Sequence, residues 1–233
     1  MGLDEVLKHQ SVWRATCPMP PPARVPTGFA ALDAVLPGSG WPAGNLTEIL
    51  GDAKGIGELH LVLPAVAALT ASGKRIVWLA PPHIPYAPAL AAGSVDLAQL
   101  VVLQPRQRRD ALCAAEQVLR SGAAAALLAW LPRMRYVELQ RFALAADTGR
   151  TLAFLYRSCA TAYEPSPAAL RLTLQASEGE LVVRLLKCRG AVAGTTLRLS
   201  LPAPRHALGR PAFPPACARD DRADRRLGLP VHA

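Results

Sequence analysis

The sequence has few charged residues and no long apolar run. Charged side chains make up 18% of the 233 residues and hydrophobic ones 51%, a balance that excludes an intrinsically disordered chain. No stretch approaches the roughly 18 consecutive apolar residues of a membrane-spanning helix. The opening residues, Met1–Glu5, lack the basic and then apolar layout of a secretion signal. We therefore expect a folded cytoplasmic protein with no membrane partner.

Cysteine is also scarce. The five cysteines are an odd number and include no C-x-x-C pair, which argues against a disulfide framework and against a zinc cluster. We expect reduced, mostly buried thiols, no metal site and no cofactor.

Lysine is rare beside arginine. Lys8, Lys54, Lys74 and Lys187 are the only lysines among 26 basic residues, and the formal net charge is +9. Guanidinium groups favour bidentate contact with phosphate or carboxylate. The excess therefore indicates nucleic acid or an acidic partner, although the nucleotide composition of the genome is an alternative source of the same bias.

Composition divides the chain into three parts. Residues 1–24 predict a short amphipathic helix that carries Trp13, followed by a proline-rich linker. Residues 25–202 alternate apolar segments with turn signals and form the expected core domain. Residues 203–233 are rich in arginine and proline and predict a flexible tail.

Strands and helices alternate through most of the core. The expected strands are residues 46–50, 75–80, 100–103, 123–130 and 151–156, and the expected helices are residues 59–71, 110–120 and 136–146. Asp110 is the expected N-cap of the second helix, with Gly122 in its stop signal. This alternation predicts an α/β fold with a mainly parallel central sheet flanked by helices. The last segments, 169–176, 180–187 and 195–201, lack intervening helices and predict an antiparallel extension near the C-terminus.

The beginning of the core resembles that of the RecA-like ATPases. The resemblance rests on Thr27-Gly28, Leu32-Asp33, a glycine-rich turn at 38–44, Glu48 in the first strand and Gly51 after it. It extends through the alternating elements to about residue 201. The resemblance implies a RecA-like core in which Gly51 opens the phosphate loop.

The loop itself departs from the pattern G-x-x-x-x-G-K-[ST], in which the lysine neutralises phosphate charge and the hydroxyl holds magnesium. Counted from Gly51, Ile56 stands at the glycine position, Gly57 at the lysine position and Glu58 at the hydroxyl position. Glu58 also adds a negative charge beside the expected phosphates. We favour a turn kept for backbone reasons over the alternative in which Lys54 reaches inward. The degenerate loop contains Gly51, Lys54, Gly55, Ile56, Gly57 and Glu58.

Two more sites of the RecA-like pattern are altered. The resemblance implies a water-activating carboxylate after the strand at 75–80, but the chain continues with Ala80-Pro81-Pro82-His83. A lone histidine after two prolines is a poor substitute base. The strand at 123–130, expected to end in a magnesium-holding aspartate, ends in Trp130. Because phosphoryl transfer depends on these groups, we expect no catalytic residue and no ATPase activity.

Within the RecA-like group, the chain resembles the ImuA family. The segments that carry this resemblance are residues 47–59, 77–82, 127–132 and 136–141. ImuA proteins are ATPase-deficient accessory proteins of bacterial mutagenic translesion DNA synthesis and have also been labelled SulA-type cell-division inhibitors. The resemblance implies induction in the SOS response to DNA damage. It also implies assembly with ImuB, a Y-family-like polymerase homologue, with RecA and an error-prone replicative-type polymerase as further candidates.

Basic residues near the expected carboxyl edge of the sheet are candidate contacts for DNA or a partner protein. The segments that correspond to the DNA-binding loops of RecA are short here, so a filament around single-stranded DNA is not expected. Any DNA binding would be weak and salt-sensitive, and a solvated charged turn is the alternative for each arginine. The candidates are Arg106, Arg108, Arg109, Arg133, Arg135 and Arg157, joined by Lys187 and Arg189, which stand where RecA-like proteins direct cations toward a neighbour, and by Trp13.

Three functions follow from these observations. The leading hypothesis is a non-catalytic accessory protein of translesion synthesis that acts through contacts with ImuB and RecA and is nucleoid-associated when engaged. The alternatives are a SulA-type inhibitor that binds the tubulin-like division protein, and a direct single-stranded DNA-binding module.

Overall fold

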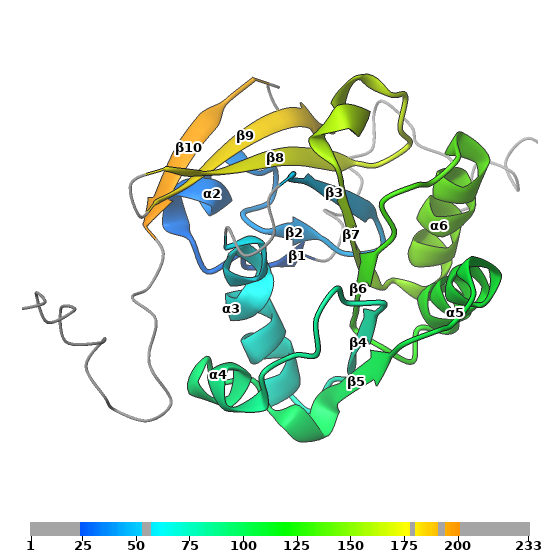
Figure 1. The fold of residues 1–233 in the computed structure, drawn as a ribbon. Coiled ribbons are helices and arrows are strands. Elements are labelled where there is room, and N and C mark those ends of the chain that lie inside the picture. Colours follow the sequence, from blue (N-terminus) through cyan, green and yellow to red (C-terminus); the bar gives the residue numbers. More distant parts are fainter. Residues whose placement is uncertain (1–23, 53–56, 178–179, 191–193, 201–233) are drawn as a thin grey trace, which may run out of the picture.

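The computed structural model describes residues 24–52, 57–177, 180–190 and 194–200 (Figure 1). Trp13, the predicted N-terminal helix, the predicted tail, and Lys54, Gly55 and Ile56 of the degenerate loop lie outside the described residues. The boundaries at 24 and 202 therefore stay predictions.

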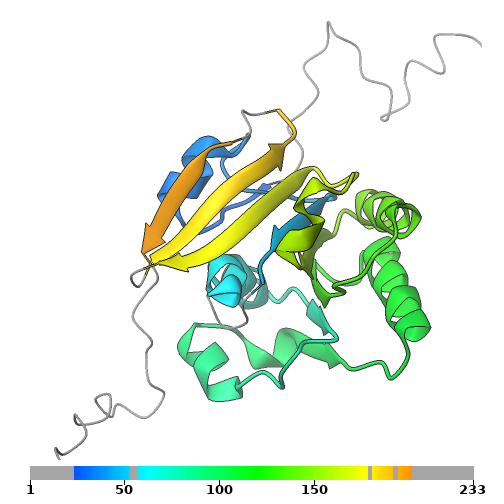
Figure 2. The same cartoon turned by 45° about the horizontal axis from the view of Figure 1, so that its top comes forward.

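An eight-stranded sheet organises the molecule, with the strand order β10-β9-β8-β3-β7-β6-β4-β5. Strands β3 to β8 pair in parallel with their neighbours, whereas β8, β9 and β10 pair antiparallel. This confirms the predicted α/β fold, including its antiparallel extension, which Figure 2 shows in yellow and orange. The strands are β3 (Leu46–Leu50), β4 (Ile76–Leu79), β5 (Leu100–Leu103), β6 (Ala126–Trp130), β7 (Leu152–Arg157), β8 (Leu170–Ser177), β9 (Glu180–Cys188) and β10 (Thr196–Ser200).

Helices cover both faces of the parallel part of the sheet. The helices are α2 (Ala30–Val35), α3 (Glu58–Ala71), α4 (Ala87–Ala92), α5 (Arg108–Ser121) and α6 (Tyr136–Gly149). In Figure 1, α3 lies on one side of the strands and α5 and α6 lie on the other. The molecule has two hydrophobic cores, one on each face of the sheet. In β6, Leu128 packs in the core that contains residues of α3, and Leu127 packs in the core that contains residues of α5 and α6. Burial on both faces explains why these strands are apolar almost throughout.

Coverage ends at β5, the edge strand. Val101 is 40% exposed and Val102 is 41% exposed. The expectation that helices cover both faces of the sheet is therefore wrong at this edge. An edge strand has one neighbour, and here β5 pairs with β4 alone among the strands that the structure describes.

A small two-stranded sheet precedes the main sheet in the chain. Its strands, β1 (Arg24–Val25) and β2 (Trp41–Pro42), pair antiparallel. Two 3-10 helices, η1 (Leu97–Gln99) and η2 (Cys159–Tyr163), lie in connections between strands of the main sheet. The Thr-Gly and Leu-Asp pairs now have a structural explanation, since the Thr27 backbone amide donates to Asp33 Oδ1 at 3.0 Å. At Gly28 φ is +86°, and an added Cβ would lie 2.3 Å from Pro64 Cβ. The Thr-Gly and Leu-Asp pairs therefore stabilise a turn that packs against α3.

Two predictions of detail are wrong. Helix α5 begins two residues earlier than predicted, at Arg108 with Gln107 as its N-cap, so Asp110 lies within the first turn. A carboxylate there complements the positive end of the helix without capping it. Of the cysteines in the described ranges, Cys113 is exposed and Cys159 and Cys188 are half-buried, so none has the buried position that we expected. The predicted stop at Gly122 is confirmed by its φ of 64°.

None of the described helices is long and apolar enough to cross a bilayer.

Candidate functional site

The altered positions of the RecA-like pattern meet in one cavity. A cavity of about 380 Å³ lies at the carboxyl edge of β3, β4, β6 and β7. Its lining includes Gly51, Asp52 and Glu58 around the glycine turn, Ala80 and Pro82 after β4, and Trp130 and Pro132 at the end of β6. Because parallel strands end at one edge, sequence positions 80 residues apart become neighbours. We call this space the carboxyl-edge cavity.

Aromatic rings form one wall of the carboxyl-edge cavity. The rings of Trp130 and Tyr156 stack with centroids 4.6 Å apart and planes 11° apart, and Trp78 lies 5.7 Å beyond Trp130. The Tyr156 hydroxyl is buried and has no hydrogen-bond partner among the residues that the structure describes. Burial, assisted by the Glu58 carboxylate, raises the pKa of Tyr156 well above its usual value. The wall is therefore apolar and uncharged where the RecA-like pattern has a magnesium-holding carboxylate.

Asp52 connects the glycine turn to the end of β7. Its Oδ1 accepts hydrogen bonds from Ser158 Oγ at 2.7 Å and from the Cys159 backbone amide at 2.8 Å. These bonds lower the pKa of Asp52, the Ser158 bond most strongly. The carboxylate thus fixes the turn and adds a second negative charge to the cavity lining.

Arg157 lines the carboxyl-edge cavity but is not a free cation. Its side chain is 1% exposed, and Nη1 lies 3.0 Å from Oε1 of Glu48, whose side chain is fully buried. Its Nη2 lies 2.9 Å from Glu164 Oε2. Our prediction that Arg157 is available to DNA or a partner is therefore wrong, because the guanidinium is buried and neutralised within the fold.

The second partner of Glu48 is a residue that sequence reasoning missed. Arg171 Nε lies 2.6 Å from Glu48 Oε2, and its other nitrogens donate to the backbone oxygens of Thr161, Ala162 and Glu164. Glu48 therefore joins three adjacent strands, β7, β3 and β8, through two buried arginines. The available signal was a carboxylate in the middle of the strand predicted at residues 46–50, because a buried charge requires a partner.

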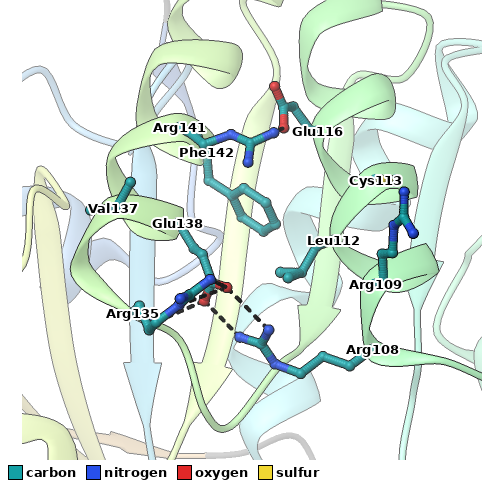
Figure 3. Close-up of a pocket in the computed structure, with 10 residues that line it drawn as sticks. All are labelled: Arg108, Arg109, Leu112, Cys113, Glu116, Arg135, Val137, Glu138, Arg141 and Phe142. Atoms are coloured by element: carbon teal, nitrogen blue, oxygen red, sulfur yellow. Dashed lines mark hydrogen bonds and ion pairs between the residues drawn. The ribbon is translucent and has the colours of Figure 1, made fainter.

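Members of both predicted arginine clusters, Arg108, Arg109 and Arg135, line one groove between α5 and α6 (Figure 3). Arg108 makes a two-pronged contact with Glu138, at 3.0 and 2.6 Å, and donates to the Arg133 carbonyl at 3.1 Å. Arg135 also pairs with Glu138, at 3.1 Å. The arginine groove, as we call it, has a volume of about 380 Å³ and is lined by Arg108, Arg109, Leu112, Cys113, Glu116, Arg135, Val137, Glu138, Arg141 and Phe142.

Charge in and around the arginine groove is partly neutralised. Glu116 pairs with Arg141 and Arg120, and Glu138 pairs with Arg108 and Arg135. Three predicted candidates keep exposed guanidinium groups with no ion pair among the residues that the structure places, namely Arg106, Arg109 and Arg133. The arginine groove can therefore bind an anionic group through Arg109 while the exposed Val137 and the half-buried Leu112 offer apolar contact.

Glu138 makes the stability of this region pH-dependent. The Arg108 hydrogen bonds foremost, together with those from the Arg135 backbone and side chain, lower the pKa of Glu138 from 4.5 to about 2. A lowered carboxyl pKa stabilises the fold above about pH 4.5, and this contribution is lost as the pH falls toward 2. Since Arg108 and Arg135 are half-exposed and exposed, we expect about 1–2 kcal/mol.

The Glu138→Gln variant tests this. Its urea midpoint should lie below that of the wild type at pH 7, and the gap should close as the pH falls from about 4.5 to about 2, because protonated glutamate resembles glutamine. A gap that stays constant down to pH 2.5 would show that the carboxylate charge is not responsible.

The remaining cation candidates differ from each other. Lys187 is half-buried and its Nζ donates to the Ser166 carbonyl at 2.8 Å. Burial, together with the nearby charges of Arg189 and Arg171, lowers the pKa of Lys187. Arg189 is exposed. Lys187 thus serves the fold, whereas Arg189 stays available. Within the described ranges, no three His, Cys, Asp or Glu side chains gather as a metal site.

Comparison with known proteins shows which proteins this chain resembles in sequence and in fold. No family model matches the chain. It is 35% identical over 101 residues to RecA of Acholeplasma laidlawii, covering 42% of this chain and 29% of that protein. It is 30% identical over 95 residues to the cell division inhibitor SulA of Edwardsiella piscicida, covering 41% and 56%.

The chain therefore spans under a third of that RecA and just over half of that SulA. Among solved structures, it is similar to the RadB recombinase with a TM-score of 0.58 and 16% identity, covering 75% of this chain and 94% of that one. Together with the strand order and the mainly parallel sheet, this likeness establishes that the chain has the RecA-like fold.

Proposed function

We propose that this chain is a RecA-like accessory protein of damage-induced mutagenic translesion DNA synthesis that does not hydrolyse ATP. In this proposal it works through protein contacts, with ImuB as the main partner and RecA and an error-prone replicative-type polymerase as further ones. The sequence similarity to RecA and to SulA supports the link to the DNA damage response, and the ImuA resemblance supplies the partners.

The observation that carries the proposal is the composition of the carboxyl-edge cavity. Its lining brings two carboxylates, Asp52 and Glu58, to the place where a RecA-like ATPase holds phosphate. Among the described lining residues, the guanidinium of Arg157 is already paired with Glu48. Two carboxylates in this lining oppose the charge of a triphosphate. The β6 end of the described lining presents Trp130 and Pro132 in place of a carboxylate that could hold magnesium. The fold is nevertheless maintained by Glu48 and the aromatic stack.

The arginine groove supports a role in protein contact. It combines exposed guanidinium groups with the half-buried Leu112 and the 64% exposed Val137. Interfaces favour arginine and apolar anchors over lysine, and this chain has both at one place. We propose that ImuB docks here.

Co-purification tests the proposal. Tagged full-length chain should capture ImuB in the absence of nucleotide, and the double variant Arg109→Glu, Val137→Asp should lose at least about tenfold in affinity. The matched control is Arg184→Glu, an exposed arginine on β9 away from the groove, which should capture ImuB as the wild type does. Failure of the wild-type chain to capture ImuB would refute the partnership.

A SulA-type inhibitor is the second candidate, because the chain covers a larger share of SulA than of RecA. The same capture experiment with the tubulin-like division protein separates the two. Capture of that protein in place of ImuB would favour the inhibitor.

A further inference from the structure

A second basic cavity lies at the opposite edge of the sheet. This amino-edge cavity, of about 560 Å³, is formed by loops that precede β3, β4, β6 and β7. Among the residues that the structure describes, its lining contains four cations, Arg24, Lys74, Arg75 and Arg150, and no aspartate or glutamate. It is separate from the carboxyl-edge cavity and from the arginine groove, with which it shares no lining residue.

The cations of the amino-edge cavity have no ion-pair partner in the described ranges. None of the four makes an ion pair or a side-chain hydrogen bond with another residue that the structure describes. Lys74, Arg75 and Arg150 are exposed, whereas Arg24 is half-buried. The Nε of Arg24 is buried without a partner, and burial lowers the pKa of Arg24. This contrasts with the arginine groove, where glutamates pair with Arg108, Arg135 and Arg141.

Helix dipoles account for only part of this charge. Helices α3, α5 and α6 end at this edge, at Ala71, Ser121 and Gly149, and each C-terminus carries about half a negative elementary charge. The three ends together offset about 1.5 of the four positive charges. A net positive potential therefore remains, in a concave surface that concentrates it.

Close packing of two helix ends builds the floor of the cavity. An added Cβ on Gly149 would lie 1.9 Å from the Leu119 carbonyl oxygen, and one on Gly122 would lie 2.9 Å from the Gly149 oxygen. The floor continues through the small residues Ala123–Ala125. Half of the described lining is glycine or alanine, and the cavity beside the cations has a volume of about 560 Å³, so an anion can approach them.

Backbone donors at this edge are largely used by the fold. The amides of Gly73, Lys74, Ala125 and Arg150 donate to the carbonyls of Thr70, Leu69, Arg75 and Asp147, respectively. A compact phosphate site is usually built from such amides. Here recognition is left to charged side chains from separate segments, an arrangement typical of contact with a phosphodiester backbone.

We propose that the amino-edge cavity binds the phosphodiester backbone of single-stranded nucleic acid without sequence preference. A flexible strand can enter a concave site of this size, and its successive phosphates can meet Lys74, Arg75 and Arg150 in turn. The proposal is independent of the ImuB contact, since it uses the other edge of the molecule.

Fluorescence anisotropy with a labelled oligothymidylate tests it. The triple variant Lys74→Gln, Arg75→Gln, Arg150→Gln should bind at least about tenfold more weakly than the wild type at 50 mM salt, and its log–log salt slope should fall by about 2, at about 0.7 per lost contact. The charge-keeping triple Lys74→Arg, Arg75→Lys, Arg150→Lys should retain affinity within about threefold, which separates charge from folding.

The control removes two exposed cations of the antiparallel extension, on β9 and β10, as Arg184→Gln, Arg198→Gln. It should bind DNA like the wild type. A wild-type chain that does not bind at 50 mM salt, or a control variant that loses as much affinity as the amino-edge triple, would overturn the proposal. Binding of inorganic phosphate or ATP that the amino-edge triple abolishes, without DNA binding, would assign the cavity to a small phosphate and would also overturn it.

Discussion

Replacing Glu48 with alanine should lower the free energy of unfolding by about 3–5 kcal/mol, because the substitution leaves two buried guanidinium groups without their shared counter-ion. Arg157 and Arg171 are 1% and 7% exposed in their side chains, so water cannot compensate for either of them. Typical domains are stable by about 5–15 kcal/mol. The variant should therefore be marginally folded, with a large drop in its urea midpoint.

The Glu180→Ala variant is the matched control. Glu180 pairs with Arg198 at 3.5 Å on the exposed β9 and β10 strands, and such pairs contribute about 0–1 kcal/mol. The Glu48→Gln variant separates charge from shape, since it keeps the side-chain volume but should still lose most of the stabilisation. A midpoint for Glu48→Gln equal to that of the wild type would show that the buried carboxylate charge is not needed.

Most of the fold was predictable because the strands are buried on both faces. Segments such as Ile76–Leu79 and Ala126–Trp130 are entirely apolar, and helix-length segments separate the strands, which is the pattern of a parallel sheet. The edge strand β5 reads equally apolar, so its exposure was not predictable. Helix α2 was missed because it has only six residues and no side-chain cap.

The carboxyl-edge cavity was predictable in outline and not in detail. The resemblance to RecA-like proteins indicated that the turn after β3 and the ends of β4 and β6 belong together, and they line one cavity. The pairing of Arg157 with Glu48 was not visible, because the two residues are 109 positions apart and meet only through strand pairing. From the sequence, Arg157 at the end of its strand was therefore predicted to be a free cation, whereas in the structure it is buried and paired.

The amino-edge cavity left no signal in the sequence. Its cations come from β1, from the segment before β4 and from the segment before β7. Each cation taken singly resembles an ordinary charge beside a helix C-terminus. Only the folded arrangement shows that they surround one space and that its described lining contains no carboxylate.

The second large expected effect is the absence of ATP hydrolysis by this chain. A general base alone contributes about 10²–10⁴-fold to a reaction rate, and the chain has Ala80 where the RecA-like pattern has that base. Trp130 occupies the position of the magnesium-holding carboxylate, stacked on Tyr156. Asp52 and Glu58 oppose a bound triphosphate further. These losses act on one reaction, so their combined effect should remove turnover entirely.

The most direct test of this account is therefore the release of phosphate from Mg-ATP by the purified full-length chain, measured with and without single-stranded DNA and beside RecA as a positive control. We expect a rate equal to that of the protein-free reaction, unchanged in the Lys54→Ala variant. Steady magnesium-dependent turnover that Lys54→Ala abolishes would contradict the account.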